Sequence, residues 1–177
     1  TVPGIHNRYN AALALAAARA ADVPDEVSRE ALAAFRGVSG RLELVRELNG
    51  VKIYNDTTAT TPEATLAALS ALDPEGKQNI VLIMGGNDKG LDMNKLLVEI
   101  PEHAKRVIML AGTGTSRVLE FLPDASVFDS LETAVKEAVA AATSGDSILL
   151  SPAFASFGMF KNEYDRGDQF NALAAKL

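Results

Sequence analysis

The residues best suited to binding chemistry follow four apolar stretches, each of which predicts a β-strand. They lie in four short segments, which are residues 55–61, 85–90, 111–115 and 151–156. These segments are rich in hydroxyl groups and glycines, and they also contain a lysine and two aspartates. Ligands of open parallel sheets bind outside the carboxyl ends of the strands. We therefore expect the four segments to meet at one edge of a sheet and to form a cleft there.

The chemistry of this predicted cleft suits a small anion. Thr61 is a good N-cap and Pro62 a good first helical residue, so the N–H groups of a helix would point at the cleft. Lys89 lies between glycines and can reach a carboxylate or a phosphate. Thr60 and Ser156 can donate hydrogen bonds from their hydroxyl groups. We expect Thr60, Lys89 and Ser156 to converge on the anion.

Each of these features also has an ordinary structural interpretation, which the sequence leaves open. Asn55-Asp56-Thr57 is typical of a strand-to-helix turn. Gly85-Gly86 could serve only a turn, although glycines also let a ligand approach the backbone closely. A single lysine such as Lys89 is most often solvated at the surface. Gly112-Thr113-Gly114 lacks the third glycine of a dinucleotide fingerprint, so we expect a loop there.

Aromatic residues and histidines are weaker candidates for a site. Phe154, Phe157 and Phe160 favour packing in the core over a stacking platform. His103 falls in a helix-to-strand connection, where we expect a surface residue. His6 precedes a helix and could cap it or contact a ligand.

The elements that must position these residues alternate along the chain. Helices are predicted at 7–21, 25–35, 62–70, 93–100, 116–122, 131–142 and 168–176. Strands are predicted at 42–45, 51–54, 79–84, 107–110, 126–128 and 147–150, and Asn49-Gly50 predicts a hairpin turn between the first two. Such alternation is typical of an α/β fold with a mostly parallel sheet and flanking helices. We place a boundary near residues 38–41, with two helices before it.

Composition excludes several classes of protein. The chain has 177 residues, no cysteine, two histidines and a formal net charge of −6. It therefore has no disulfide scaffold or thiolate metal site, and it is a poor candidate for binding nucleic acid or an anionic membrane. We expect no membrane-spanning segment, no metal site and no Ser-His-Asp triad, and the sequence contains no P-loop motif. Because the chain starts at Thr1 rather than methionine, we expect it to be part of a longer protein.

Several stretches in order along the whole chain resemble elements of the Mur ligases. They are Gly4-Ile5-His6-Asn7-Arg8-Tyr9-Asn10, Gly40-Arg41-Leu42-Glu43, Tyr54-Asn55-Asp56-Thr57-Thr58-Ala59-Thr60, Gly85-Gly86-Asn87-Asp88-Lys89, Leu149 to Phe157, Phe160-Lys161-Asn162 and Arg166-Gly167-Asp168-Gln169-Phe170. Their combination is specific to the members of the family that add D-glutamate.

This resemblance implies a domain organisation and an activity. Residues 1–38 would be the last helices of a central ATPase domain, and residues 39–177 a Rossmann-like C-terminal ligase domain. The activity would be ATP-dependent amide bond formation in cytoplasmic synthesis of peptidoglycan precursors. ATP, with Mg²⁺, would phosphorylate the carboxylate of UDP-MurNAc-L-alanine, and the amine of D-glutamate would attack the acyl phosphate. The chain alone, without a P-loop, should be inactive.

The resemblance also implies roles for individual residues. The position of Thr58 and the residues Thr60, Lys89 and Ser156 correspond to the binding site for D-glutamate. The nucleotide side corresponds to Asn7, Asn10, Arg41 and Asp56.

Four positions depart from the family pattern. Thr58 stands where the family has a lysine, and Gly40 where it has a histidine. Gly158 replaces an aspartate, and Glu163 replaces an aromatic residue. The negative charge of Glu163 would repel a dicarboxylate substrate if its side chain faced the site. The identity of the amino acid is therefore less determined than the class of reaction. Two alternative hypotheses remain open. The chain could belong to a related ligase for another amino acid, or it could be a stand-alone Rossmann-like module that binds a nucleotide or amino acid without catalysis.

Overall fold

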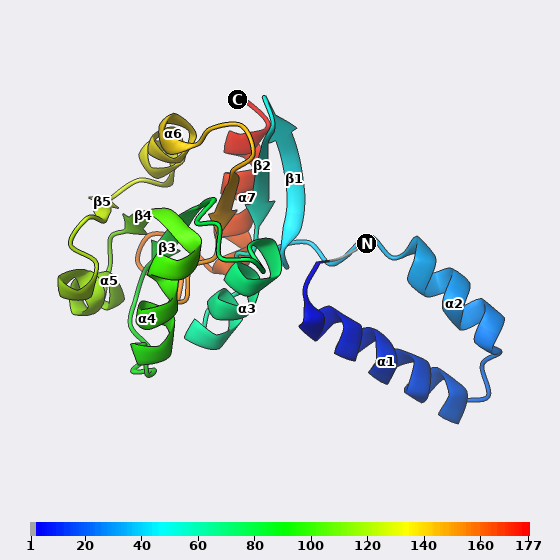
Figure 1. The fold of residues 1–177 in the computed structure, drawn as a ribbon. Coiled ribbons are helices and arrows are strands. Elements are labelled where there is room, and N and C mark those ends of the chain that lie inside the picture. Colours follow the sequence, from blue (N-terminus) through cyan, green and yellow to red (C-terminus); the bar gives the residue numbers. More distant parts are fainter. Residues whose placement is uncertain (1–2) are drawn as a thin grey trace.

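The computed structural model describes residues 3–177, so Thr1 lies outside the described part. A six-stranded sheet in the order β1-β2-β6-β3-β4-β5 forms its centre, with helices on both sides (Figure 1). The strands are β1 (Glu43–Leu48), β2 (Val51–Asn55), β3 (Ile80–Gly85), β4 (Ala104–Leu110), β5 (Ser126–Phe128) and β6 (Ser147–Leu150). The helices are α1 (Ile5–Ala20), α2 (Asp25–Ala34), α3 (Pro62–Leu72), α4 (Asn94–His103), α5 (Thr113–Val118), α6 (Leu131–Ala141) and α7 (Glu163–Ala174), and a 3-10 turn, η1, spans Leu119–Phe121.

Strand pairing confirms the predicted fold class. The hydrogen-bonded pairs β2–β6, β6–β3, β3–β4 and β4–β5 are all parallel. Among the six strands of the described residues, β1 alone is antiparallel, and it joins β2 through a tight hairpin. Asn49 and Gly50 form that turn with φ angles of 51° and 79°, which only asparagine, aspartate and glycine adopt readily. The carboxyl ends of β2, β6, β3 and β4 therefore lie side by side.

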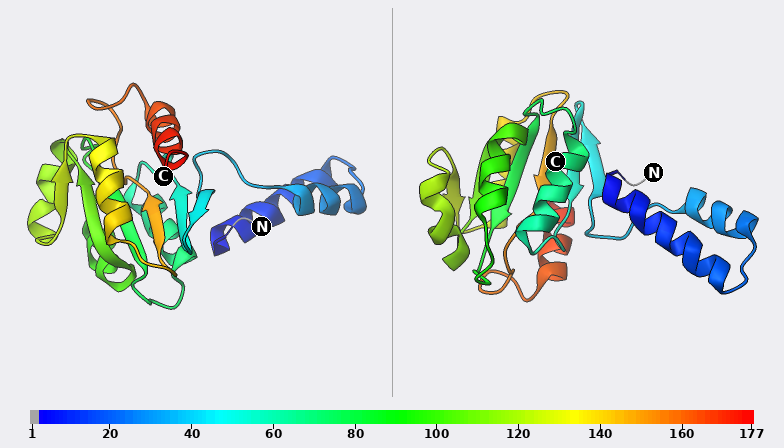
Figure 2. Two further views of the ribbon diagram at one scale, coloured as in Figure 1. Left: turned by 90° about the horizontal axis from the view of Figure 1, so that it is seen from above. Right: turned by 60° about the horizontal axis from the view of Figure 1, so that its bottom comes forward.

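The sheet separates two hydrophobic clusters, and helices cover each of its faces (Figure 2). Along β3, Ile80, Leu82 and Met84 pack into the layer that α3 and α4 cover, while Val81 and Ile83 pack into the layer of α6 and α7. This alternation follows from the two-residue period of a strand. Because every residue of β3 is buried, this strand anchors the carboxyl edge rigidly.

The first two helices lie beside the sheet rather than in either layer (Figures 1 and 2). Helix α1 buries none of its residues, and α2 buries only Ser28. A bidentate contact between Arg19 and Asp25 joins the pair, with both N···O distances at 2.7 Å. Among residues 3–177, no helix combines the length and the apolar character needed to cross a membrane.

Several element boundaries and environments differ from the sequence-based expectations. Helix α7 begins at Glu163 rather than 168, because the Asn162 side chain caps it by accepting a bond from the Asp165 N–H at 2.9 Å. The expectation of a loop at residues 112–114 was wrong in part, because α5 starts at Thr113. His103 is not a surface residue: its side chain is 12% exposed and its Nδ1 lies 3.3 Å from the Asp73 carboxylate.

Two further assignments need correction. Phe154 is buried in the core as expected, but Phe157 is 61% exposed, since it lies on the loop after β6 and faces solvent. His6 does not precede the first helix but lies within its first turn.

Candidate functional site

The segment after β6 connects the loops on either side of it at the carboxyl edge. On the β2 side, the Ala153 N–H donates to the Ala59 carbonyl at 2.9 Å. On the β3 side, Asn87 and Ala155 exchange two backbone hydrogen bonds of 2.9 and 3.0 Å. The prediction that these segments meet at one edge is therefore confirmed.

The segment after β4 joins the same assembly through the start of α5. The Gly114 N–H donates to the Gly86 carbonyl at 3.0 Å. The hydroxyl of Thr115 donates to the Leu110 carbonyl at 2.5 Å and accepts a bond from the Gly86 N–H at 3.3 Å. All four predicted segments thus form one continuous hydrogen-bonded rim.

The glycines of this rim allow the loops to approach one another. A Cβ atom on Gly86, whose φ is 134°, would overlap the carbonyl oxygen of Ala155. A Cβ atom on Gly112 would in turn overlap the carbonyl oxygen of Gly86. Close approach at Gly86 and Gly112 therefore serves the packing of neighbouring loops of the same chain, while the approach of a ligand to Gly85-Gly86 remains a prediction.

Two of the three predicted anion-binding side chains are in direct contact. The Lys89 ammonium group donates to the Thr60 hydroxyl at 3.1 Å, from the loop after β3 to the loop after β2. Thr60 directly precedes the N-cap Thr61, whose hydroxyl accepts a bond from the Ala64 N–H at 3.4 Å. The positive N-terminus of α3 and the Lys89 ammonium therefore lie on the same side of the rim.

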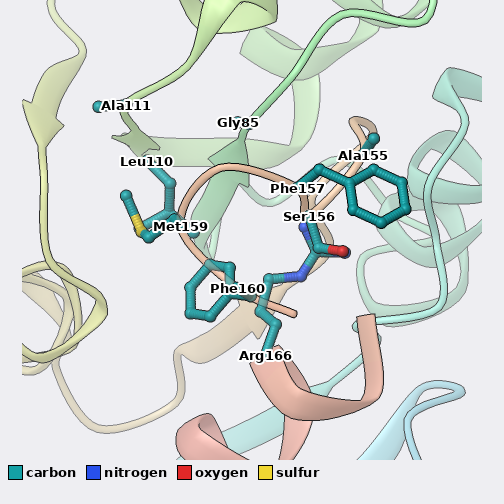
Figure 3. Close-up of a pocket in the computed structure, with 10 residues that line it drawn as sticks. Gly85, Leu110, Ala111, Ala155, Ser156, Phe157, Met159, Phe160 and Arg166 are labelled. Atoms are coloured by element: carbon teal, nitrogen blue, oxygen red, sulfur yellow. The ribbon is translucent and has the colours of Figure 1, made fainter. Parts of the chain in front are cut away.

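Ser156, the third predicted residue, is buried immediately after the Ala155–Asn87 bridge. It lines a narrow pocket under the rim (Figure 3). The pocket lining comes from the loops after β3, β4 and β6 and from α7, and consists of Gly85, Gly86, Leu110, Ala111, Ala155, Ser156, Phe157, Met159, Phe160 and Arg166. Ser156 and Lys89 thus lie on loops that are bonded directly to each other.

Arg166 is the charged side chain of this pocket and was not among the predicted site residues. It is fully buried, and its Nε and Nη2 donate to the hydroxyl and the carbonyl of Thr57 at 3.1 and 2.8 Å. Burial lowers the pKa of Arg166 to about 10, although the nearby Glu163 carboxylate acts in the opposite direction. The Arg166-Gly167 pair, which is part of the family resemblance, could have indicated this buried contact. Gly167 lets α7 approach Thr57 closely.

Asp56, predicted on the nucleotide side, is buried beneath the rim. Its carboxylate accepts bonds from the Leu42 N–H at 2.9 Å and from the Ser151 hydroxyl at 2.8 Å. Burial raises its pKa to about 6, although both hydrogen bonds and the charge of Arg41 favour the ionised form. Asp56 therefore joins the hairpin to the segment after β6 in this structure.

Thr58 also bonds toward the hairpin. Its hydroxyl donates to the Gly40 carbonyl at 2.9 Å, and its N–H donates to the same oxygen at 3.1 Å. The side chain at this position is therefore engaged with the backbone. Its assignment to the amino acid remains a prediction.

The remaining predicted nucleotide residues do not lie together. Arg41 is exposed and follows Gly40, whose carbonyl binds Thr58 of the rim, while Asn7 and Asn10 lie on α1. The Asn7 amide donates to the Pro3 carbonyl at 2.6 Å. The start of α1 lies against the end of α3, since a Cβ atom on Gly4 would be 3.1 Å from the Ala71 Cβ. That end of α3 is opposite Thr61, so the asparagines are separated from the rim.

Metal ligands do not cluster in the part of the chain that the structure describes. Within residues 3–177, no three His, Asp or Glu side chains lie close enough together to hold a metal ion. The groups that the rim does offer are hydroxyls, backbone N–H groups and the Lys89 ammonium, which suit an anion.

Comparison with known sequences shows which family has these features. Residues 40–154 match the family model described as Mur ligase, glutamate ligase domain. The chain is 46% identical to the UDP-N-acetylmuramoylalanine–D-glutamate ligase of Roseiflexus sp. (strain RS-1), over 96% of this chain and 37% of that protein. It is 40% identical to the protein of the same name from Thermoanaerobacter sp. (strain X514), over 99% of this chain and 39% of that protein.

Solved structures show the same fold. A UDP-N-acetylmuramoylalanyl-D-glutamyl-2,6-diaminopimelate–D-alanyl-D-alanyl ligase from Acinetobacter baumannii matches with a TM-score of 0.72 and 19% identity, over 98% of this chain and 37% of that chain. E. coli FolC in complex with ADP matches with a TM-score of 0.71 and 23% identity, over 94% of this chain and 39% of that chain.

These matches cover nearly all of this chain but under two fifths of each relative. The family model spans the hairpin, the parallel sheet and three of the four rim segments, together with the first part of the fourth. From the sheet order, the rim and this match together, the chain belongs to the Mur ligase family.

Proposed function

We propose that this chain is the amino-acid-binding part of an ATP-dependent ligase that joins D-glutamate to UDP-MurNAc-L-alanine. Its 46% identity to a named D-glutamate ligase supports the choice of amino acid. The observation that carries the proposal is the contact between Lys89 and Thr60, which places an ammonium group at the rim. The chain spans only 37–40% of the relatives it matches, so UDP-MurNAc-L-alanine and most of the ATP site would lie outside it.

The rim suits a dicarboxylate with a free amine. Lys89, Thr60 and Ser156 together offer one cationic group and two hydroxyl donors, which complement carboxylate oxygens. Fixing both carboxylates leaves the amine as the free end of D-glutamate. Holding that amine in one orientation toward the acyl phosphate lowers the entropic part of the activation barrier.

Arg41 and Asp56 would lie on the nucleotide side, with Asn7 and Asn10 on the preceding helix. The likeness to the ADP complex of FolC supports the use of ATP by this fold. Magnesium would accompany the phosphates, but no residue of this chain is assigned to it, since the described residues contain no cluster of metal ligands. The reaction would take place in the cytoplasm.

Three departures from the family pattern would tune the choice of amino acid. Thr58 supplies a hydroxyl bonded to Gly40 where a lysine would supply charge. Gly158 packs near the Asn87 amide, and Glu163 starts α7 next to Arg166. Because one cationic contact is missing, Lys89 carries a larger share of the attraction for the substrate carboxylates.

The test uses the full-length protein encoded by the gene that contains this chain. ADP release is measured with UDP-MurNAc-L-alanine and a panel of D- and L-amino acids. We expect release to depend on D-glutamate and to be far slower with L-glutamate or D-aspartate. Strict dependence on another amino acid would replace D-glutamate in the proposal while retaining the class of reaction.

The stand-alone binding module predicts a different result. A module that only binds would show no ADP release with any amino acid, yet D-glutamate or a nucleotide would still perturb the NMR signals of the rim residues. Amino-acid-dependent ADP release would exclude that alternative.

A further inference from the structure

Lys89 lies in the middle of a loop that lacks regular secondary structure. The loop, residues 86–93, runs from the end of β3 to the start of α4. Its first part is fixed by the Asn87–Ala155 bridge, but Lys89 and Gly90 are exposed. A long, flexible side chain on an exposed loop has no fixed position unless other contacts supply one.

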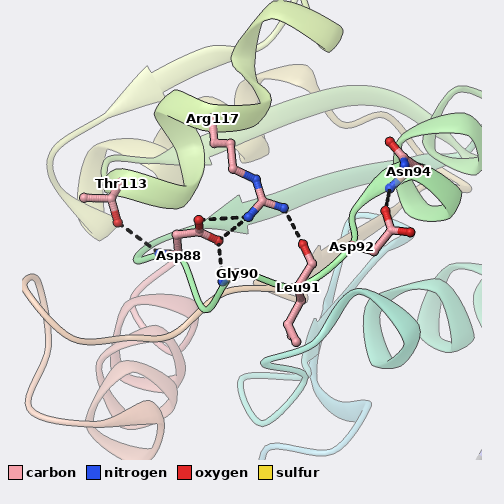
Figure 4. Close-up of polar contacts among 7 residues, drawn as sticks. All are labelled: Asp88, Gly90, Leu91, Asp92, Asn94, Thr113 and Arg117. Atoms are coloured by element: carbon pink, nitrogen blue, oxygen red, sulfur yellow. Dashed lines mark hydrogen bonds and ion pairs between the residues drawn. The ribbon is translucent and has the colours of Figure 1, made fainter.

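Arg117 supplies such contacts from the last turn of α5 (Figure 4). Its Nη1 lies 2.7 and 2.8 Å from the two carboxylate oxygens of Asp88, the residue before Lys89. Its Nη2 donates to the carbonyl of Leu91, two residues after Lys89. One guanidinium group therefore fixes the chain on both sides of the lysine.

Two further bonds make Asp88 a defined anchor. Its N–H donates to the Thr113 hydroxyl at 3.0 Å, and its carboxylate accepts a bond from the Gly90 N–H at 3.0 Å (Figure 4). The second bond closes a turn around Lys89, and Gly90 completes it with a φ of 70°. The side chain of Lys89 leaves this turn toward Thr60.

The exposure of the Asp88–Arg117 pair separates its role from that of a core contact. The side chains of Arg117 and Asp88 are 38% and 29% exposed. Solvent-exposed ion pairs contribute little to the stability of a fold, but a guanidinium group that makes several hydrogen bonds fixes geometry well. The Arg117 guanidinium lowers the pKa of Asp88, as does the bond from Gly90, so both contacts favour the ionised carboxylate.

We infer that Arg117 is a positioning residue: by holding Asp88 and Leu91, it sets where the Lys89 ammonium meets the substrate carboxylate. This inference rests on the proposed function for the identity of the substrate. It predicts that loss of Arg117 weakens the use of D-glutamate without affecting the other two substrates, because only Lys89 is displaced.

The kinetic test compares Arg117→Met with the wild-type full-length ligase. We expect the KM for D-glutamate to rise about tenfold, the order of effect of a misplaced contact, with kcat at saturating D-glutamate within about twofold of wild type. The KM values for ATP and UDP-MurNAc-L-alanine should not change. The single ammonium group of Arg117→Lys should keep a contact with Asp88 and lose the one with Leu91. Its KM for D-glutamate should therefore lie between the values of wild type and Arg117→Met.

Arg106→Met is the matched control. Arg106 also pairs with a carboxylate, that of Glu137 at 3.3 Å, and donates to a backbone carbonyl, that of Asp124 at 2.9 Å. The exposure of this pair, 32% and 37%, is similar, but it lies near the start of β4, away from the rim. We expect wild-type KM values for this variant, which would separate positioning from a general loss of stability.

A second measurement does not depend on the substrate. Amide hydrogen exchange at Lys89 and Gly90 should become faster in Arg117→Met and remain unchanged in Arg106→Met. If wild type does not use D-glutamate, the proposed function fails, while faster exchange would still support the positioning of Lys89. Unchanged exchange in Arg117→Met, or a wild-type KM for the amino acid that the enzyme uses, would overturn the inference.

Discussion

The two loops that meet through Thr60 and Lys89 are held in opposite ways. The loop after β2, residues 56–61, is tied down from inside by the buried Arg166 and Asp56. The loop after β3, residues 86–93, is tied down from outside by the partly exposed Arg117. One loop is therefore part of the folded core, and the other is a surface loop with a defined shape.

This difference implies a division of labour at the rim. Contacts made by buried polar groups are costly to lose, because the partner left behind has no water to replace the missing bond. Contacts at the surface can be lost with little effect on stability. Substitutions in the inner network should therefore reduce the stability of the chain more strongly, while those in the outer network should act mainly on binding.

Arg166→Ala should have the largest effect on stability. It leaves the Thr57 carbonyl without its 2.8 Å donor and opens a cavity beneath the rim. We expect a loss of about 3 kcal/mol in the free energy of unfolding, typical of a cavity combined with an unpaired buried acceptor. Urea unfolding of the chain measures it. A loss no greater than that of Arg117→Met would contradict the division into inner and outer networks.

Asp56→Asn should change how stability depends on pH. Burial raises the pKa of Asp56 to about 6, so between about 4 and 6 the folded chain binds more protons than the unfolded chain. The stabilisation from this group is therefore complete below about pH 4 and is lost as pH rises through 6. We expect wild type to lose roughly 2 kcal/mol relative to the variant across that range.

Asp88→Asn tests the opposite pH dependence of stability, on the loop after β3. The bond to Arg117 lowers the pKa of Asp88, so its contribution is present above its ordinary pKa and is lost as pH falls. Urea midpoints from pH 3 to 8 compare both variants with wild type. If the contributions of the two aspartates to stability changed with pH in the same direction, the comparison of the two loops would be wrong.

Thr57→Val removes one hydroxyl from the inner network while keeping the shape of the side chain. The hydroxyl donates to the Glu163 carbonyl at 2.7 Å and accepts a bond from Arg166. Because the Thr57 carbonyl still binds Arg166, we expect a loss of only about 1.5 kcal/mol in urea unfolding. A loss equal to that of Arg166→Ala would show that the hydroxyl is the essential contact.

Lys89→Ala should have the smallest effect on stability and a large effect on function. Its ammonium is exposed, so the free energy of unfolding should change by less than about 0.5 kcal/mol. In the full-length ligase, the KM for D-glutamate should rise or turnover should stop. Wild-type kinetics in this variant would refute the role of Lys89 in binding the substrate.

The sequence was sufficient for the fold class and the opening hairpin because its signals were local and strong, but the order of the strands was not predicted. The turn at Asn49-Gly50, the alternation of strands and helices, and the N-cap at Thr61 each follow from short-range rules. Placing polar residues after parallel strands then led to the rim. The contact between Lys89 and Thr60 is one outcome of that reasoning.

What the sequence did not reveal depends on long-range packing. Arg166 resembles any arginine near a helix start until the fold buries it against Thr57, 109 residues away. Arg117 gains its role only because α5 faces the loop after β3, and His103 gains a partner only because α4 ends near Asp73. No local sequence pattern around Phe157 indicates that its side chain faces solvent.

The contact between the glycines of the rim and neighbouring carbonyl oxygens has a practical consequence for enzyme redesign. A mutant library aimed at a new amino acid should leave Gly86 and Gly112 unchanged, since any larger residue there collides with a main-chain oxygen. Thr58, Phe157 and Glu163 are better positions to vary, because their side chains can change in size or charge while the backbone of the rim stays in place.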